Sequence, residues 1–332
     1  MDITRKLRHK ALLISVLSLI TWGGVNAQNV DYSVVSVPEE SGTDFMKITS
    51  ASDYVCLPLV KRSRNNIDWL SNRILGITRN GSAIAYLSFR NNTTNIFIKD
   101  LEKQGSSVQR TNRTNVLDFS FSPDGKDLCF SEKRGDNNQI FRTDAEKGYV
   151  CRQITSGASD YSPVYSPDKK QLFFARTEAN GATIWSYDFT NNFLSSFVPG
   201  MNPCPVKGET AFLVSRPTSM GRSEIWKINY ETGEEECIVS DPVRSFTSPS
   251  VSPDGKWILF VGNSQIKWDK GQYNNTDLFV CRMDGSEMTQ LTYHAADDLS
   301  PIWSSDGKYI YFISQRGDAE GNANIWRMTF NY

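Results

Sequence analysis

Histidine is scarce in this sequence, which has two copies among 332 residues, at His9 and His294. The sequence also lacks a His-Glu-x-x-His pattern, a Gly-x-Ser-x-Gly nucleophile elbow and a glycine-rich phosphate loop. Zinc centres and manganese-type lyase centres need several imidazole ligands. The sequence therefore favours a non-catalytic role, and we expect neither a metal site nor a cofactor.

Long hydrophobic runs are absent as well. The longest run, residues 11–20, is shorter than the stretch of about 20 residues that spans a bilayer. Four basic residues precede it and the small-residue site at 25–27 follows it, as in a cleavable secretory signal. No cysteine lies at the expected cleavage site directly after this run, so a lipid anchor is not expected. We expect residues 1–27 to be removed and the protein to be periplasmic or secreted, without membrane insertion.

An excess of basic charge is lacking too. Removal of four basic residues and one acidic residue from totals of 36 and 37 leaves 32 against 36. This balance excludes nucleic acid as an expected partner. The six cysteines show no C-x-x-C spacing, and we expect buried thiols, with Cys129, Cys151, Cys237 and Cys281 in strands and Cys204 in a loop. Export leaves one or two disulfides open as an alternative.

A Gly-centred turn, a strand, a polar loop and an Ile/Leu-aromatic pair recur six times along the chain. The clearest turns read Ser-Pro-Asp-Gly-Lys or a close variant, at residues 122–126, 166–170, 252–256 and 305–308, with weaker copies at 78–81 and 207–208. The pairs are Ile96-Phe97, Ile140-Phe141, Ile184-Trp185, Ile225-Trp226, Leu278-Phe279 and Ile325-Trp326. A period of roughly 40–45 residues carried by short strands is typical of propeller blades. We therefore expect an all-β, six-bladed β-propeller of four-stranded antiparallel blades.

The two ends of the repeat array predict how the ring closes. The last copy stops after its third strand, whereas residues 45–54 are similar to residues 154–161 of a complete copy. We expect this N-terminal segment to complete the last blade and so to remove an exposed sheet edge. The propeller should then span residues 43–332, after an extension at residues 28–42. The aromatic pairs, including Trp185, Trp226 and Trp326, should pack as core between blades.

The repeat resembles that of the TolB-like propellers, which are related to the WD-type propellers. A stretch that begins with Phe, has Ser one or two residues later and ends in Gly follows the turn and leads to the Ile-aromatic strand, most clearly at residues 130–141 and 312–326. The resemblance covers residues from about 43 to 330, and it implies the fold while leaving the function open. TolB carries an additional N-terminal α/β domain. Only about 40 residues precede the repeats in this sequence, so we expect a stand-alone propeller here.

Charged residues gather in the loops that follow second strands and precede first strands, at one rim of the expected ring. The candidates for ligand binding there are Arg134, Arg176, Arg216, Arg316, Asp160, His294 and Asp298. Forked Arg contacts at this rim would bind a carboxylate-bearing peptide or glycan. Alternatively, these Arg and Asp residues pair with each other within and between blades.

Two segments depart from the repeat and are expected to form long loops at the same rim. One is residues 57–72, and the other is residues 262–276, with Lys267, Trp268 and Tyr273. Exposed Trp and Tyr side chains beside Lys offer contact area together with a polar group. Long loops in a compact domain often carry function, so we add these three residues to the candidates.

Together these features predict a monomeric binding module of the cell envelope that binds a protein or a peptide through its loop-rich face. One alternative is a glycan-binding protein that uses Trp268 and Tyr273 as stacking platforms. Another is a polysaccharide- or peptide-acting enzyme with its site in the channel mouth near His294 and Asp298. The oligogalacturonate-lyase-like propellers are similar in their repeats, but they depend on several His ligands that this chain lacks.

Overall fold

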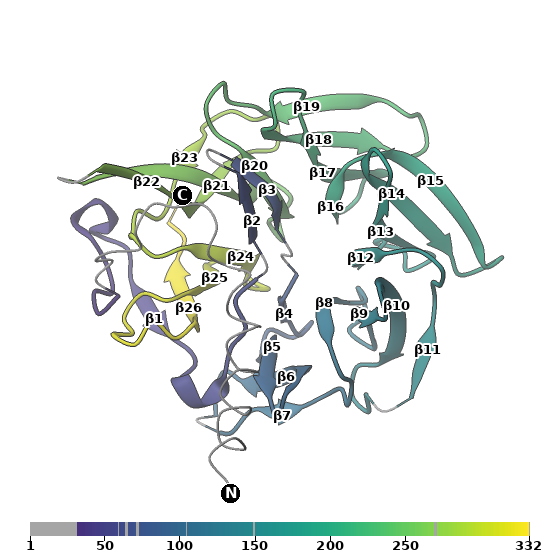
Figure 1. The fold of residues 1–332 in the computed structure, drawn as a ribbon, viewed down its shortest axis with the longest axis horizontal. Coiled ribbons are helices and arrows are strands. Elements are labelled where there is room, and N and C mark those ends of the chain that lie inside the picture. Colours follow the sequence, from purple (N-terminus) through teal and green to yellow (C-terminus); the bar gives the residue numbers. More distant parts are fainter. Residues whose placement is uncertain are drawn as a thin grey trace, which may run out of the picture. The chain divides into compact units, whose positions relative to one another are not determined.

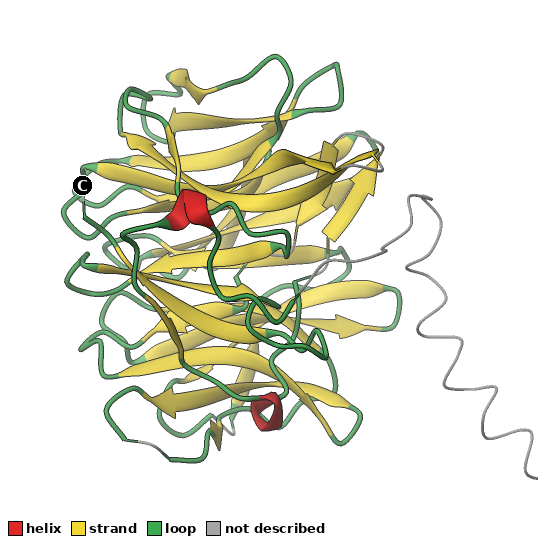
Figure 2. Cartoon of the chain, turned by 90° about the vertical axis from the view of Figure 1, so that its left-hand side faces the viewer, coloured by secondary structure: helices red, strands yellow, loops and turns green. Residues whose placement is uncertain are grey.

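The computed structural model describes residues 32–331 except 59, 64–65, 71–72, 104, 149 and 269–270, and at residues 60–63, 66–70, 264–268 and 271–274 it describes the backbone alone. The expected signal peptide lies outside the described residues. The described body is a ring of six four-stranded antiparallel sheets, which confirms the predicted six-bladed propeller (Figure 1). Viewed from the side in Figure 2, it consists almost entirely of strands and loops.

The first strand of each blade lies nearest the centre of the ring (Figure 1). Blade one consists of β4 (Leu75–Ile77), β5 (Ala83–Arg90), β6 (Thr93–Asp100) and β7 (Val108–Gln109). Blade two consists of β8 (Val116–Phe121), β9 (Asp127–Arg134), β10 (Asn137–Asp144) and β11 (Cys151–Gln153). Blade three consists of β12 (Asp160–Tyr165), β13 (Gln171–Glu178), β14 (Gly181–Asp188) and β15 (Phe193–Pro199). Blade four consists of β16 (Met201–Pro205), β17 (Ala211–Pro217), β18 (Ser223–Asn229) and β19 (Glu235–Val239). Blade five consists of β20 (Phe246–Val251), β21 (Trp257–Trp268), β22 (Gly271–Arg282) and β23 (Thr289–Gln290). Blade six consists of β24 (Asp298–Trp303), β25 (Tyr309–Ser314), β26 (Asn324–Thr329) and β1 (Phe45–Lys47).

The N-terminal strand closes the ring as predicted. Strand β1 pairs with β26 in antiparallel register, with Phe45 opposite Met328 and Lys47 opposite Trp326. The extension before β1 also takes part in the fold. The N–H groups of Gly317 and Asp318 donate to carbonyl groups of this extension at 2.7 and 2.8 Å. Blade six is therefore built from both ends of the chain.

Both segments that break the repeat fold as hairpins rather than loops. Residues 57–72 contain the two-stranded sheet of β2 (Val60–Ser63) and β3 (Asn66–Leu70), and β3 lies against β20 and β18. The expected loop at 262–276 is corrected to a continuation of blade five, because β21 and β22 stay paired as far as Trp268 and Gly271. The two helices of the described chain are three-residue turns, η1 (Pro38–Glu40) and η2 (Ala51–Asp53). No helix among these residues is long and apolar enough to cross a membrane.

The hydrophobic core lies between neighbouring blades. The aliphatic member of all six Ile/Leu-aromatic pairs is fully buried, and one cluster joins blades one, two and six through side chains such as Phe97, Phe130 and Ile325. Trp326 is buried as predicted. Trp185 and Trp226 are half-buried and pack against clusters that join neighbouring blades, so they lie at the edge of the core. An arginine also stacks on each of these two rings.

All six cysteines are free thiols. Cys129, Cys204 and Cys281 are buried, whereas Cys237 is exposed, so the expectation of buried thiols holds only in part. Cys204 lies within β16 and not in a loop, because this first strand is extended by pairing with β17. Burial raises the pKa of the Cys129 and Cys281 thiols to about 12, so neither side chain is a thiolate nucleophile at neutral pH.

Candidate functional site

The four candidate arginines of the loop-rich rim, together with Arg90 of blade one, form a repeated structural unit. Each stacks on an aromatic side chain of its own blade and forms an ion pair with a nearby acid. The pairs are Arg90 with Asp53, Arg134 with Glu132, Arg176 with Asp160, Arg216 with Glu235, and Arg316 with Glu40 and Asp298. Of the two interpretations of these charges, ligand binding or pairing with each other, the structure shows the second at this rim.

Blade three shows this unit most clearly. The guanidinium of Arg176 donates two hydrogen bonds to the Asp160 carboxylate, at 2.7 and 3.0 Å, and lies 4.3 Å from the ring centre of Trp185. Asp160 is completely buried. The Nε and Nη2 groups of Arg176 are both occupied by the Asp160 carboxylate, and the two charges compensate each other. This pair of donors is therefore not available to a carboxylate ligand.

The Arg316 side chain is also completely buried, together with both of its acidic partners. It donates to the Glu40 carboxylate at 3.1 and 3.2 Å and to Asp298. Glu40 comes from the N-terminal extension, so this cluster fastens the extension to blade six. Burial raises the pKa of Asp298 to about 6, against the opposing effect of Arg316. We refer to Glu40, Asp298 and Arg316 below as the latch cluster.

His294 is 1% exposed and is not available at the surface. Its Nδ1 accepts a hydrogen bond from the Ala296 N–H at 2.9 Å, and its carbonyl oxygen accepts one from Asn275 at 2.7 Å. The imidazole thus organises the loop before β24. Within the described residues, no group of three or more His, Cys, Asp or Glu side chains is placed to hold a metal ion.

Lys267, Trp268 and Tyr273 lie at the end of the extended β21–β22 hairpin. Lys267 pairs with Gln272, Trp268 with Gly271, and Tyr273 with Ile266. Their side chains lie outside the described parts of the structure, so their role in recognition remains a prediction.

The centre of the ring has a different construction, set by the first strands. In four of them a bulge places Ser162, Asn202, Ser248 or Ser300 in the left-handed conformation, with φ between 52° and 66°, just before a proline. The bulge turns backbone donors toward the preceding blade. The N–H of Ser162 donates to Asp118 at 2.8 Å, and the N–H of Ser248 donates to the Ser215 hydroxyl at 3.1 Å. Neighbouring blades are therefore joined around the channel.

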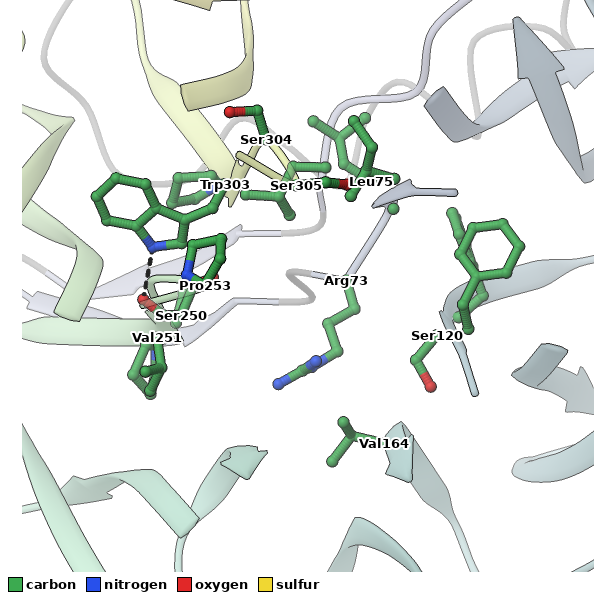
Figure 3. Close-up of a pocket in the computed structure, with 18 residues that line it drawn as sticks. Arg73, Leu75, Ser120, Val164, Ser250, Val251, Pro253, Trp303, Ser304 and Ser305 are labelled. Atoms are coloured by element: carbon green, nitrogen blue, oxygen red, sulfur yellow. Dashed lines mark hydrogen bonds between the residues drawn. The ribbon is translucent and has the colours of Figure 1, made fainter. Parts of the chain in front are cut away.

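A cavity of about 340 Å³ lies at this centre. It is lined by first strands and by the turns that follow them, which include Pro253, Ser304 and Ser305 (Figure 3). The cavity thus lies toward the side of the ring that carries the Ser-Pro-Asp-Gly turns, opposite the rim that the sequence favoured. None of the seven candidate residues with described side chains lines it.

Arg73 is the one charged side chain among the described residues that line the cavity. It lies just before β4 in blade one, and its guanidinium projects into the space between Ser120 and Val164 on one side and Ser250 and Val251 on the other (Figure 3). Its Nη2 donates to the carbonyl oxygen of Pro203 in blade four, across the ring. Sequence reasoning missed Arg73. When the turns at Thr78 and Ser166 are aligned, blade one has Ile74-Leu75 where blades three to six have Ser-Pro or Asn-Pro, and Arg73 directly precedes this departure from the repeat.

Comparison with known proteins agrees with this architecture. Residues 76–267, more than half of the chain, match the family model described as the TolB beta propeller domain. The chain belongs to the TolB beta-propeller family. The Tol-Pal system protein TolB from Blochmanniella floridana is 30% identical over 122 residues, which are 33% of this chain and 26% of that protein. The chain matches about a quarter or less of the length of such curated relatives.

Solved structures of low sequence identity share the fold. TolB from Acinetobacter baumannii superposes with a TM-score of 0.60 at 17% identity, over 75% of this chain and 64% of that chain. Oligogalacturonate lyase from Vibrio parahaemolyticus gives a TM-score of 0.58 at 12% identity, over 90% and 96% of the two chains. One fold therefore accommodates a Tol protein and a lyase, and the function of this chain has to be argued from its own residues.

Proposed function

We propose that this protein is an exported, non-catalytic binding module of the cell envelope that binds a protein or peptide segment at the centre of its ring. The observation that carries the proposal is the central cavity with its single charged side chain, Arg73. A volume of about 340 Å³ lies at the lower end of the range for ligand sites. It suits one or two side chains of a segment that docks at the channel mouth.

The state of the loop-rich rim supports a binding role over catalysis. A general acid or base has to reach its substrate, whereas His294 and Asp298 are buried and engaged within the protein. The name of the relative from Blochmanniella floridana places that protein in the Tol-Pal system. This membership supports, for the present chain, a partner in the envelope.

Filling the cavity tests the proposal. Val164→Trp and Ser250→Trp place a large side chain at the cavity wall, and Val150→Trp adds the same side chain at a position that is 87% exposed. We expect a partner that is captured from envelope extract by the wild type and by Val150→Trp to be lost from both cavity variants. Capture would be quantified by mass spectrometry, on proteins whose thermal unfolding shows that they are folded.

Two results would contradict the proposal. One is a partner retained at wild-type level by both folded cavity variants. The other is turnover of a polysaccharide or peptide substrate by the wild type, which would favour the enzyme alternative. Assays on oligogalacturonate and on a peptide mixture measure this turnover directly.

A further inference from the structure

Three hydrogen-bond donors that lack a partner within the described protein line the central cavity together. They are Arg73 Nε and the hydroxyl groups of Ser120 and Ser248, and all three atoms are buried. Buried polar groups in folded proteins are almost always hydrogen-bonded. Three unused donors from blades one, two and five around one cavity therefore indicate a place prepared for an acceptor.

The charge of the cavity indicates which acceptor it suits. No carboxylate of the described chain lies within ion-pair distance of Arg73, in contrast to the arginines of the loop-rich rim. The nearby Asp118 is buried and engaged, because its two oxygens accept hydrogen bonds from the Ser131 hydroxyl and the Ser162 N–H. Arg73 is half-buried, and its Coulombic interaction with Asp118 is not a direct ion pair, so an anionic ligand would be stabilised here.

The walls limit the ligand further. Apart from Arg73 and several serines, the cavity is lined by apolar groups such as Val164, Pro301 and Ile302. A single positive charge matches a single negative charge better than a phosphate dianion. An anion head with an apolar body complements both parts of the surface.

We infer that the central cavity is a carboxylate-binding site, in which Arg73 Nε and the hydroxyls of Ser120 and Ser248 hold the carboxylate and the apolar walls hold the group next to it. The inference rests on the proposed function in so far as the ligand is a peptide, whose C-terminal carboxylate beside an apolar side chain has this chemistry. A free aliphatic carboxylic acid has the same chemistry, so the probes have to separate the two sources.

Calorimetric titration of the mature protein with matched probes tests the inference. The probes are N-acetylated Ala-Ala-Val with a free C-terminus, the same peptide as its C-terminal amide, 3-methylbutanoate, and inorganic phosphate. We expect the free peptide to bind at least about tenfold more tightly than its amide, since hydrogen bonds to charged groups contribute most. Tighter binding of the peptide than of 3-methylbutanoate assigns the site to a peptide terminus, and equal binding assigns it to a free acid; either result supports a carboxylate site.

Variants locate the effect. Arg73→Met should weaken carboxylate binding at least about tenfold, Arg73→Lys less, and Ser120→Ala and Ser248→Ala several-fold each. Arg79→Met, an exposed arginine of the same blade, should leave binding unchanged. If Arg73→Met fails to fold, the lysine and alanine variants still decide the question.

Equal affinity for the peptide and its amide, wild-type affinity in folded Arg73 and serine variants, or a preference for phosphate would each overturn the inference. The cavity-filling variants show whether a failure of the carboxylate site also means a failure of the proposed binding function. Partner capture that is lost on Val164→Trp and retained by Arg73→Met would preserve the binding module and remove the carboxylate site.

Discussion

The latch cluster combines two buried carboxylates with one buried guanidinium. Breaking a buried ion pair by removing one partner costs about 3–5 kcal/mol, because the other charge stays buried. Arg316 compensates part of the cost of the two acids. Burial nevertheless raises the pKa of Asp298 to about 6, compared with an ordinary value of about 4 for aspartate.

This raised pKa predicts a pH dependence of stability. Between pH 4 and pH 6 the folded protein holds the Asp298 proton more tightly than the unfolded chain does. The contribution of this group to the free energy of unfolding is therefore greatest below pH 4, is lost as the pH rises through 6, and is constant above that. Asp298→Asn removes the titrating group. We expect the difference in unfolding free energy, wild type minus variant, to decrease from pH 4 to pH 6.

Urea unfolding at several pH values measures this difference, with Asp136→Asn in an exposed turn as the control. The control should show no such decrease. If the difference in unfolding free energy between the wild type and Asp298→Asn stays the same from pH 4 to pH 7, burial does not raise the pKa of Asp298 as described.

At the scale of the element, the turns between first and second strands have one informative exception. Gly81, Gly125, Gly255 and Gly307 adopt positive φ in four copies, whereas Lys169 occupies the same place in blade three with φ of 64°. The left-handed conformation costs an ordinary residue about 1–2 kcal/mol. Lys169 offsets this cost through its Nζ, which forms ion pairs with Asp124 and Asp127 of blade two.

Two substitutions separate these opposing effects. Lys169→Ala loses the ion pairs and keeps the unfavourable φ, whereas Lys169→Gly loses the ion pairs and relieves it. We expect Lys169→Gly to be more stable than Lys169→Ala by about 1 kcal/mol, as measured by urea unfolding at pH 7. Equal stabilities would show that the backbone of this turn is not strained. The same pair of substitutions at exposed Lys133, inside β9, should reverse the order.

Across the whole molecule, ring closure depends on the N-terminal segment. This segment supplies β1, Glu40 of the latch cluster, and Thr49, whose hydroxyl accepts the N–H of Ile325 at 2.8 Å. We expect a variant that lacks residues 28–50 to unfold at a temperature lower by about 10 °C or more, since the deletion removes β1 together with the hydrogen bonds that the extension forms with blade six. A variant that lacks only residues 28–30 is the control. Calorimetric melting of the deletion at the wild-type temperature would contradict the closure described here.

The architecture was predictable because each blade repeats the same local pattern. Six buried Ile/Leu residues at regular spacing, and a last copy that lacks one strand, indicate both the number of blades and the closure. The site was not predictable in the same way. Arg73 reaches Pro203, 130 positions away in the sequence, only because the closed ring places blades one and four on opposite sides of one channel. The rim arginines recur with the repeat, and the structure shows that this recurrence belongs to the scaffold.

The closure by β1 also governs the order in which the protein is assembled. The Asp44 N–H donates to the Thr329 hydroxyl, and these residues are 285 positions apart. During synthesis, β1 emerges before β26 and has no partner until almost the entire chain has followed. Contacts of such high sequence separation form slowly, so the final step of folding is the docking of the first strand. Until then the unpaired edge of β26 is open to pairing with another chain, and the newly made protein passes through its most aggregation-prone state just before the ring closes.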